Sequence, residues 1–387
     1  MKHKILLLDG DGTQTLPIAE SLYKLGACLH TFYSHKLSYG YATKYIKYKV
    51  DISVIKNETD FLLFTKTYLT DNKIDIIIPL GDSSAEFLSK NKTELSKHSK
   101  FIMPDYDVFI KAYNKGSLMS ICEENNFPHP RTIKLNSTTI NNIDNKIFPA
   151  LIKPDITWGA RGLTLVNNVE ELKTHYPLIK AQYGECCLQE MIPQGGAQVE
   201  VQVLVGKNNE LLFSSVIYKY RWYPEKAGSS CCNISVKNDE IVNICYELMK
   251  TLGWQGFADF DTIEDPRNGE LKIMELNPRV PACVKTAVKS GIDWGNIIVD
   301  ETLDNQHKNY TYTTGKKLRH IGFEFLWFFY SKNRFRTKPN WFNFFDKNLS
   351  FQDFSWKDPL PFFYGTFGNI KKQFSSEFRK SKSGARK

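Results

Sequence analysis

Lysines, glycines and acidic residues that can contact a phosphorylated ligand follow one another in order between residues 114 and 279. One lysine stands at the head of the helix-like segment 114–127, and another lies in the strand-like segment 148–154. A loop with glycines at 159 and 162 follows, and its backbone N–H groups can lie over phosphates. The series continues with Gln-Glu-Met-Ile and ends on Asp-x-Asp and Glu-x-Asn-Pro-Arg. Each feature is common by itself, so the prediction depends on their order.

The acidic residues at the end of this series fall in a predicted β-hairpin. The segments 256–263 and 271–277 are separated by Glu-Asp-Pro-Arg-Asn-Gly-Glu, a composition typical of a turn. Alternate side chains of a strand point to opposite faces. Asp259 and Asp261 therefore share one face of the hairpin. The alternative interpretation is that these carboxylates are only solvated.

The residues upstream indicate the scaffold that positions these groups. Apolar segments at 4–9 and 74–82 each end in a Gly-Asp turn before a helix-like stretch, and alternation of strands with helices predicts a parallel α/β sheet. Ligands bind such sheets at the carboxyl ends of the strands, where both turns fall. Beyond residue 105 the pattern is β-rich, with one amphipathic helix at 241–254.

This series resembles the ATP-grasp superfamily over about residues 1 to 300. The most specific part is MELNPRV at 274–280 followed by SGID at 290–293. It looks most like the carbamoyl-phosphate-synthase-like branch, which includes biotin-carboxylase-type and D-aspartate-ligase-type enzymes. The resemblance implies a mixed α/β and α+β chain: an N-terminal parallel α/β (pre-ATP-grasp) domain, then a two-lobed ATP-grasp fold that holds ATP between two antiparallel sheets.

The resemblance also implies domain boundaries. We expect the pre-ATP-grasp domain at 1–104 and the ATP-grasp domain at 105–309. Within the latter, the lid lobe covers about 115–190 and the metal-binding lobe about 191–309. Residues 310–387 form an aromatic, basic C-terminal extension.

The implied reaction is an ATP-dependent ligation: a carboxylate takes the γ-phosphoryl group of ATP, and an amine attacks the resulting acylphosphate. By resemblance, Lys115 and Lys153 contact the α- and β-phosphates. The glycine loop covers the triphosphate, the segment after it borders adenine, and one of two alternating residues holds the ribose. These expected ATP contacts are Trp158, Gly159, Arg161 and Gly162 in the loop, Gln189, Glu190, Met191 and Ile192 beside adenine, and Gln198 or Glu200 at the ribose.

The metal ligands expected by the same resemblance are Asp261, Glu275 and Asn277. Carboxylate and amide oxygens are the hard ligands that Mg2+ prefers, and Mn2+ is the expected substitute. Arg279 is the expected catalytic residue together with Lys153, because a guanidinium can neutralise the transferring phosphoryl group and the acyl oxygen.

Other residues are expected on the substrate side. Arg221, Lys226 and Ser229 lie where relatives recognise the acceptor, and the two Gly-Asp turns bring Asp9 and Asp82 to the same side of the cleft. The partners are therefore a small-molecule carboxylate and an amine.

Two other functions are considered. The sequence DGDGT at 9–13 matches the opening of haloacid-dehalogenase-like phosphatases, but only about seventy residues separate it from the next acidic motif. That interpretation also leaves the series at 114–279 unexplained. A nucleotide-binding ATP-grasp protein without turnover is the second alternative, although the expected ligands and both lysines are intact.

Composition limits the remaining classes. The chain has 387 residues, 42% hydrophobic and 24% charged, which is typical of a globular protein. Its most apolar run, Phe323–Tyr330, is too short to span a membrane. The eight cysteines show no zinc spacing, so reduced thiols in a cytoplasm are expected.

The net charge of +9 belongs to the C-terminus. From Tyr330 to Lys387 there are 13 basic and 4 acidic residues, and 20 of the 52 aromatic residues fall between Phe323 and Phe378. Two interpretations stay open: an anchor at the inner face of the membrane, or a small subdomain with a basic tail. Nucleic acid is not expected. Such a tail resembles ATP-grasp proteins of surface-polysaccharide synthesis, and a homodimer is an option because related enzymes dimerise.

Overall fold

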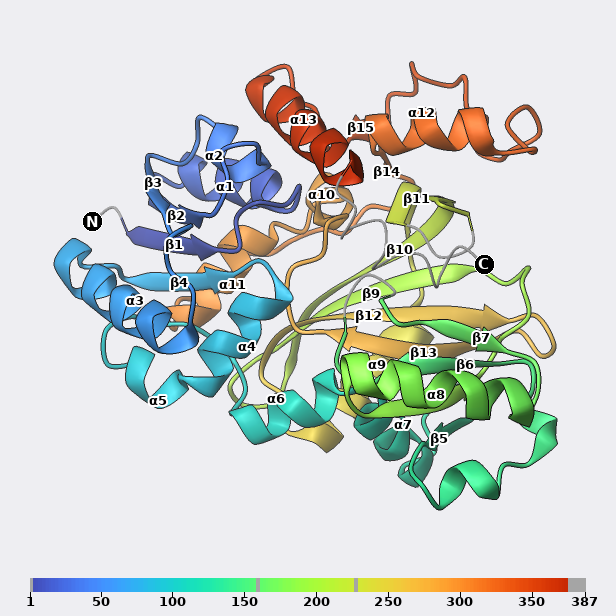
Figure 1. Ribbon diagram of the computed structural model, residues 1–387. Helices are drawn as coiled ribbons and strands as arrows, with labels where there is room; N and C mark the ends of the chain where they lie inside the picture. The colour runs from blue at the N-terminus through green and yellow to red at the C-terminus, as the bar shows by residue number, and fades with distance from the viewer. Residues whose placement is uncertain (1–2, 158–160, 226–228, 375–387) are drawn as a thin grey trace.

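The computed structural model describes residues 3–157, 161–225 and 229–374, and their strands form three sheets (Figure 1). The first sheet is parallel, with the strand order β3-β2-β1-β4. Its strands are β1 (Lys4–Leu8), β2 (Cys28–Tyr33), β3 (Tyr48–Asp51) and β4 (Ile76–Pro79), and the helices around it are α1 (Thr15–Lys24), α2 (Tyr39–Ala42), α3 (Glu58–Asn72), α4 (Asp82–Lys90) and α5 (Lys92–Leu95). The predicted N-terminal parallel α/β domain is confirmed.

The second sheet is small and antiparallel, and it has a core of its own. Its strand order is β5-β8-β6-β7, and α8 (Val169–Tyr183) packs against it. The strands are β5 (Thr132–Lys134), β6 (Ala150–Pro154), β7 (Thr164–Val166) and β8 (Cys186–Glu190). Buried Ile152, Leu172 and Leu188 join strand to helix. Before this sheet come α6 (Tyr106–Tyr113) and α7 (Lys115–Glu124), and two short 3-10 turns lie at Thr139–Asn141 and Asn145–Ile147.

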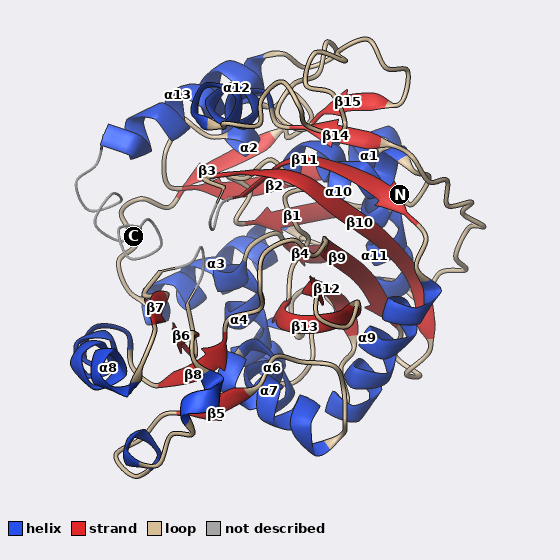
Figure 2. Cartoon of the chain, turned by 90° about the vertical axis from the view of Figure 1, so that its right-hand side faces the viewer, coloured by secondary structure: helices blue, strands red, loops and turns tan. Residues whose placement is uncertain are grey.

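The third sheet has seven strands in the order β13-β12-β9-β10-β11-β14-β15. In Figure 2 it lies apart from the small sheet. The strands up to β13 are β9 (Gln198–Val205), β10 (Leu211–Tyr223), β11 (Ser229–Val236), β12 (Gly256–Asp265) and β13 (Glu270–Asn277), and its helices are α9 (Asp239–Leu252), α10 (Val284–Lys289) and α11 (Trp294–Thr302).

The two faces of this sheet differ because side chains alternate along each strand. On β9, Val199, Val201 and Val203 pack in one core with α9. The residues between them, Glu200 and Gln202, point to the opposite face. One face of the sheet is therefore apolar, and the other offers polar side chains.

The C-terminal extension is built onto the same sheet. Strand β14 (Lys317–Arg319) pairs antiparallel with β11, and β15 (Leu349–Phe351) pairs parallel with β14. Helices α12 (Ile321–Tyr330) and α13 (Leu360–Phe374) lie at the top of Figure 1. Among the described residues, no helix has the length and hydropathy needed to cross a membrane. All eight cysteines are free thiols.

Candidate active site

A cavity of about 620 Å³ lies where the N-terminal domain, the large sheet and the extension meet. The acidic hairpin, the first Gly-Asp turn and the start of α12 all contribute to its wall. A separate cavity of about 410 Å³ lies on the N-terminal domain beside Asp9 and Asp11, away from the hairpin. The larger cavity is the candidate active site because Lys115, Arg279 and the predicted metal ligands line it, whereas Lys153 and residues 189–192 do not.

The β12–β13 hairpin brings four oxygen-bearing side chains together. Asp261 lies opposite Glu275 in the ladder, and Asp259 lies opposite Asn277. The amide Nδ2 of Asn277 lies 3.4 Å from Asp261 Oδ2 and 3.5 Å from Asp259 Oδ2. The spacing of residues in the sequence anticipated this convergence, because a hairpin in register puts alternate residues of both strands on one face.

The pKa values of the two aspartates of β12 are shifted in opposite directions. Burial raises the pKa of Asp259 well above its ordinary value. Burial acts the same way on Asp261, but the ammonium of Lys219 and the guanidinium of Arg279 outweigh it and lower the pKa of Asp261. A hydrogen-bonded cation favours the ionised form of a neighbouring carboxylate.

This donor set fits a hard cation. Among the described residues, Asp259 Oδ1 is buried without a hydrogen-bond partner. Such an atom costs free energy unless a ligand satisfies it. Carboxylates from two strands and one amide match the oxygen ligands of Mg2+. Described His, Cys, Asp and Glu residues alone form no metal-binding group of three, and the expected ligand set combines two carboxylates with the amide of Asn277.

Lys219 on β10 is a member of the site that the sequence analysis did not single out. Its ammonium lies 3.1 Å from Glu200 Oε2 and contacts Asp261 Oδ1 more closely still. Burial alone would lower the pKa of Lys219, but these carboxylates raise it well above the ordinary value. No motif marks this lysine in the sequence. Its role depends on β10 crossing next to β9 in the sheet.

Arg279 connects the hairpin to the N-terminal domain. Its Nε lies 3.0 Å from Asp82 Oδ1, at the first residue of α4, and one terminal nitrogen lies 3.8 Å from Asp259 Oδ2. Burial would lower the pKa of Arg279, but the carboxylates of Asp82 and Asp259 raise it. The arginine expected to be catalytic therefore faces the metal-ligand candidates and one predicted substrate residue at once.

The two predicted phosphate-binding lysines come from α7 and β6, outside the large sheet. Lys115 heads α7, its Nζ lies 3.5 Å from Glu275 Oε2, and it donates to the carbonyl of Thr157 at 2.7 Å. Lys153 on β6 donates to Gln189 Oε1. Burial lowers the pKa of Lys153, while Glu275 opposes that shift. Both ammonium groups therefore lie within electrostatic reach of the acidic hairpin.

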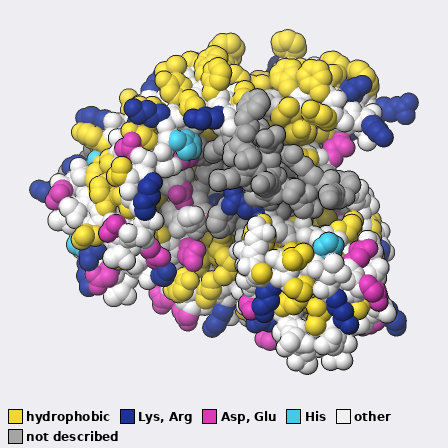
Figure 3. Space-filling model, in the orientation of Figure 1, with side chains coloured by type: hydrophobic (Ala, Val, Ile, Leu, Met, Phe, Trp, Pro, Cys, Tyr) yellow, Lys and Arg dark blue, Asp and Glu magenta, His cyan; other side chains and the backbone are white. Residues whose placement is uncertain are grey.

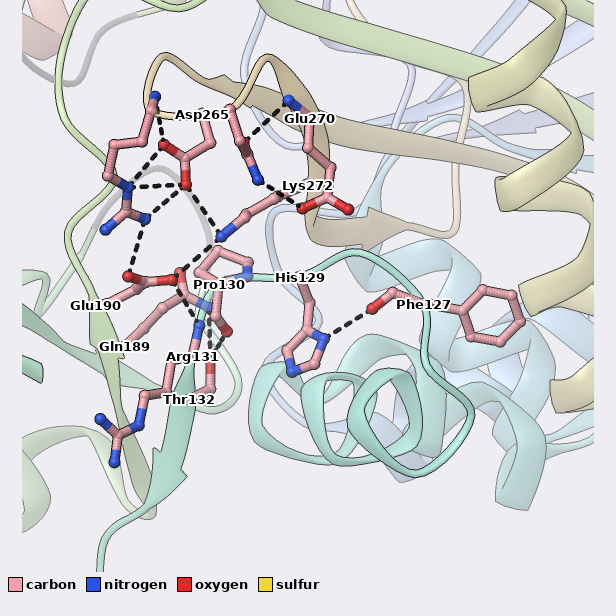
Figure 4. Close-up of polar contacts among 12 residues, drawn as sticks. Phe127, His129, Pro130, Arg131, Thr132, Gln189, Glu190, Asp265, Glu270 and Lys272 are labelled. Atoms are coloured by element: carbon pink, nitrogen blue, oxygen red, sulfur yellow. Dashed lines mark hydrogen bonds and ion pairs between the residues drawn. The ribbon is translucent and has the colours of Figure 1, made fainter.

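The predicted adenine segment joins the two antiparallel sheets. Figure 4 shows Glu190, at the end of β8, facing the β12–β13 turn. Its carboxylate accepts from the Arg131 backbone at 2.9 Å and lies 3.0 Å from Arg267 and 3.4 Å from Lys272. Burial would raise the pKa of Glu190, but these hydrogen bonds lower it. The Glu190 side chain therefore connects the lobes.

The neighbours of Glu190 continue the small sheet. The Met191 N–H donates to the Pro149 carbonyl at 3.0 Å, and Ile192 is buried.

The two residues predicted to contact the ribose, Gln198 and Glu200, both line the cavity. The carboxylate of Glu200 already holds Lys219 and the amide of Gln202.

The residues predicted to contact substrate differ in whether they line the cavity. Ser229 and Asp82 line the cavity. Asp9 instead accepts a hydrogen bond from the Ser84 N–H at 2.8 Å, and this contact caps α4. Burial raises the pKa of Asp9.

Trp158, Gly159 and Lys226 lie outside the described residues. Arg161 and Gly162 lie at the end of the glycine loop, before β7, and Gly162 has a positive φ of 71°.

The expectation for Arg221 is corrected by its contacts. Its side chain is buried and does not line the cavity. It donates through Nε and one terminal nitrogen to Glu324 of α12, at 2.8 Å each, and through the other nitrogen to Thr337 and the carbonyl of Pro339. Its polar atoms are used to hold the extension on the sheet, so they are not available to a substrate.

The extension supplies cavity residues that sequence reasoning missed. These are His320, Phe323, Gln352 and Asn369. Gln352 donates to Thr13 Oγ1 at 2.8 Å, and Asn369 lies 3.4 Å from the hydroxyl of Tyr39. Each pair joins residues more than 300 positions apart, so no local pattern could have revealed it.

Comparison with known proteins defines the class of the fold. Residues 112–283 match the model of the ATP-grasp domain family. The biotin carboxylase domain of 2-oxoglutarate carboxylase from Hydrogenobacter thermophilus, solved with MgADP and bicarbonate, is 16% identical with a TM-score of 0.68, over 82% of this chain and 74% of that one. Residues 112–283 are therefore similar to an ATP-grasp domain, and the chain shares the fold of this solved structure.

One sequence relative and one structural neighbour are named as ligases. The D-aspartate ligase of Enterococcus faecium (strain Aus0004) is 25% identical over 272 residues, which are 64% of this chain and 63% of that protein. The L-amino acid ligase of Bacillus licheniformis is 16% identical with a TM-score of 0.62, over 79% of this chain and 75% of that one. This chain thus spans under two thirds of the length of its curated relative.

Proposed function

We propose that the chain is an ATP- and Mg2+-dependent ligase that joins a carboxylate to an amine and releases ADP and phosphate. The observation that supports this most directly is the 3.5 Å approach of Lys115 Nζ to Glu275 Oε2. It puts a predicted phosphate-binding cation beside a predicted metal ligand, on the wall of one cavity. Phosphoryl transfer needs such positioning and charge neutralisation more than covalent chemistry.

The proposed reaction has two steps. A carboxylate oxygen of the substrate attacks the γ-phosphorus, and the bond from that phosphorus to the β-phosphate oxygen breaks, so ADP leaves. The amine nitrogen then attacks the acyl carbon, a C–N bond forms, phosphate leaves, and the surplus proton of the amine goes to solvent. Lys115 and Lys153 hold the phosphates, and Arg279 neutralises charge on the transferring group and acyl oxygen.

The oxygen ligands and the nucleotide contacts follow the same arrangement. Asp261, Glu275 and Asn277 would hold Mg2+, which neutralises the phosphate charge when bound. Gln198 is the better ribose contact, because the carboxylate of Glu200 is already engaged by Lys219. Residues 189–192 border adenine in this proposal. Use of Mn2+ in place of Mg2+, a homodimer and a cytoplasmic location stay predictions.

The relatives suggest which substrates to test first. One is named a D-aspartate ligase and another an L-amino acid ligase, so amino acids are the first class. The part of the cavity formed by Thr13, Gln14, Gln352 and Asn369 offers neutral hydroxyl and amide groups. These groups both donate and accept hydrogen bonds, which suits a sugar. A sugar carboxylate in surface-polysaccharide synthesis is therefore the second class.

Calorimetric titration with a non-hydrolysable ATP analogue, with and without Mg2+, tests the nucleotide site. We expect Mg2+-dependent binding that Lys153→Ala weakens by roughly 30-fold, because it removes a buried cation from the phosphates. Lys111→Ala is the control, since Lys111 is exposed on neighbouring α6. Absence of binding by folded wild-type protein would contradict the proposal.

Turnover separates a ligase from a nucleotide-binding protein without activity. With each carboxylate alone, ATP and hydroxylamine, an acylphosphate is trapped as a hydroxamate while ADP is released. With the amine also present, we expect amide and ADP in equal amounts. ATP binding without ADP release from any amino acid or sugar acid would favour the non-catalytic alternative.

A further inference from the structure

Helix α13 is oriented opposite to the usual pattern of a surface helix. Its glycines face the protein: a Cβ on Gly365 would collide with the ring of Tyr39, and one on Gly368 with the carbonyl of Leu37. The opposite face carries large apolar side chains that are exposed. They are Leu360, Phe363, Phe367 and Ile370. A helix of a globular protein ordinarily turns its apolar stripe inward, so this face lacks the contact that its composition predicts.

Helix α12 and the loops around it repeat this arrangement. Trp327 is buried, whereas Phe329 and Tyr330 are exposed. In the loops, Phe345 is 98% exposed and Trp356 is 88% exposed. We call the exposed apolar side chains of this region the aromatic rim: Phe325, Leu326, Phe329, Tyr330, Phe335, Phe342, Phe345, Trp356, Leu360, Phe363, Tyr364, Phe367 and Ile370. Figure 3 shows hydrophobic side chains gathered along the top of the molecule, over α13 and α12.

The acidic side chains of the extension are paired, whereas most of its basic side chains are exposed. Its acidic residues within 310–371 turn inward: Glu324 binds Arg221, Asp353 lies 3.2 Å from His320, Asp358 accepts from Thr43, and Asp346 pairs with Lys317. Among the basic side chains of the same region, Arg319 is buried beside Glu324 and Lys317 pairs with Asp346, whereas six others are exposed. The exposed ones are Lys332, Arg336, Lys338, Lys347, Lys357 and Lys371. The surface around the rim is therefore apolar and positive.

We propose that the aromatic rim docks on an anionic lipid bilayer. Exposed Phe and Trp rings suit the headgroup level of a membrane, and Lys and Arg attract anionic lipid. Neither feature alone would select this partner. An apolar protein surface would not need the outward lysines, and nucleic acid would not need thirteen exposed apolar side chains. The proposed ligase reaction does not require a membrane, so this inference goes beyond it.

Vesicle flotation with the full-length protein tests the inference. We expect flotation with vesicles of phosphatidylcholine and phosphatidylglycerol, and binding about tenfold weaker to phosphatidylcholine alone. The double variant Phe363→Ser/Phe367→Ser should bind the anionic vesicles about tenfold less. Both side chains are more than half exposed, so the thermal midpoint should not fall.

A matched control removes exposed apolar groups elsewhere. Val54 and Leu63 are 80% and 65% exposed on the N-terminal domain, and Val54→Ser/Leu63→Ser should float like wild type. Equal loss in this control, equal binding to both vesicle types, or no flotation by wild type would each overturn the inference. The inference would also be overturned if the wild-type protein formed a dimer and bound no vesicles, and the rim variant were monomeric. Unchanged nucleotide affinity in the rim variant separates this test from that of the ligase.

Discussion

Lys219 and Arg221 lie two residues apart on β10, yet their buried charges are arranged differently. Arg221 is held bidentately by Glu324, with further acceptors from Thr337 and Pro339. Lys219 faces Asp261 and Glu200 on the cavity wall. There, Asp259 Oδ1 is buried without a hydrogen-bond partner among the described residues.

The difference separates a structural ion cluster from a site built for a ligand. Burying a charge is costly unless its partners are complete. The Arg221 cluster is complete, and Arg319 adds a second guanidinium 3.6 Å from Glu324. The Lys219 cluster leaves one oxygen of Asp259, next to the proposed Mg2+ ligands, without a partner among the described residues. Burial and charge alone therefore do not separate the two clusters, whereas the unpartnered oxygen beside the cavity does.

The largest expected effect on stability comes from the complete cluster. Glu324→Gln should lower the free energy of unfolding by about 3–5 kcal/mol, because it leaves two buried guanidinium groups without their carboxylate. The measurement is thermal and denaturant unfolding, with Glu124→Gln on the exposed face of α7 as control. Nucleotide affinity of the folded variant should not change. A variant as stable as wild type would show that the pair is not structural.

A substitution in the Lys219 cluster should instead reduce activity and leave stability unchanged. Glu275→Gln should lower kcat/KM by roughly 10²–10³-fold, because it removes an anionic ligand and charge stabilisation at the phosphoryl group. The thermal midpoint should stay near that of wild type. Steady-state ADP release with an active substrate pair measures the effect, and Glu270→Gln, exposed on the same hairpin, is the control. Near-normal turnover would remove Glu275 from the site.

The smallest expected effect concerns the ion pair between Asp265 and Arg267 in the β12–β13 turn, whose arginine also contacts Glu190 of the small sheet. Hydrogen bonds from Arg267 hold the pKa of Asp265 below its ordinary value of 3.8. A depressed carboxyl pKa stabilises the fold at pH values above 3.8, and that contribution is lost as the pH falls below it. At neutral pH, Asp265→Asn should therefore cost about 1 kcal/mol, because Arg267 is half exposed.

The pH dependence supplies the test of that pair. The difference in thermal midpoint between wild type and Asp265→Asn should be constant above about pH 5 and shrink towards about pH 3. Asp71→Asn, at an exposed position on α3, should show no such trend. A constant difference across this range would contradict the role of the ionised carboxylate.

Much of the fold was predictable because its signals are local. Strand and helix periodicities predicted the parallel N-terminal sheet, and the turn at 264–270 predicted the hairpin that aligns Asp261 with Glu275. A strand alternates with a period of two, so residues on one face can be read directly from their spacing. The order of lysine, glycine loop and acidic hairpin was then enough to indicate the ATP-grasp class.

The sequence by itself determined the order of these elements and the face on which each acidic side chain lies. Only the tertiary structure decided which distant residues join them. The order of strands in the sheet places Lys219 in the site, whereas Arg221 pairs with Glu324 outside it. Gln352 contacts Thr13, which lies 339 positions away in the sequence. Such contacts depend on how the sheets and the extension pack. Packing brings together segments whose local sequences carry no mark of one another, so no spacing rule could have supplied these partners.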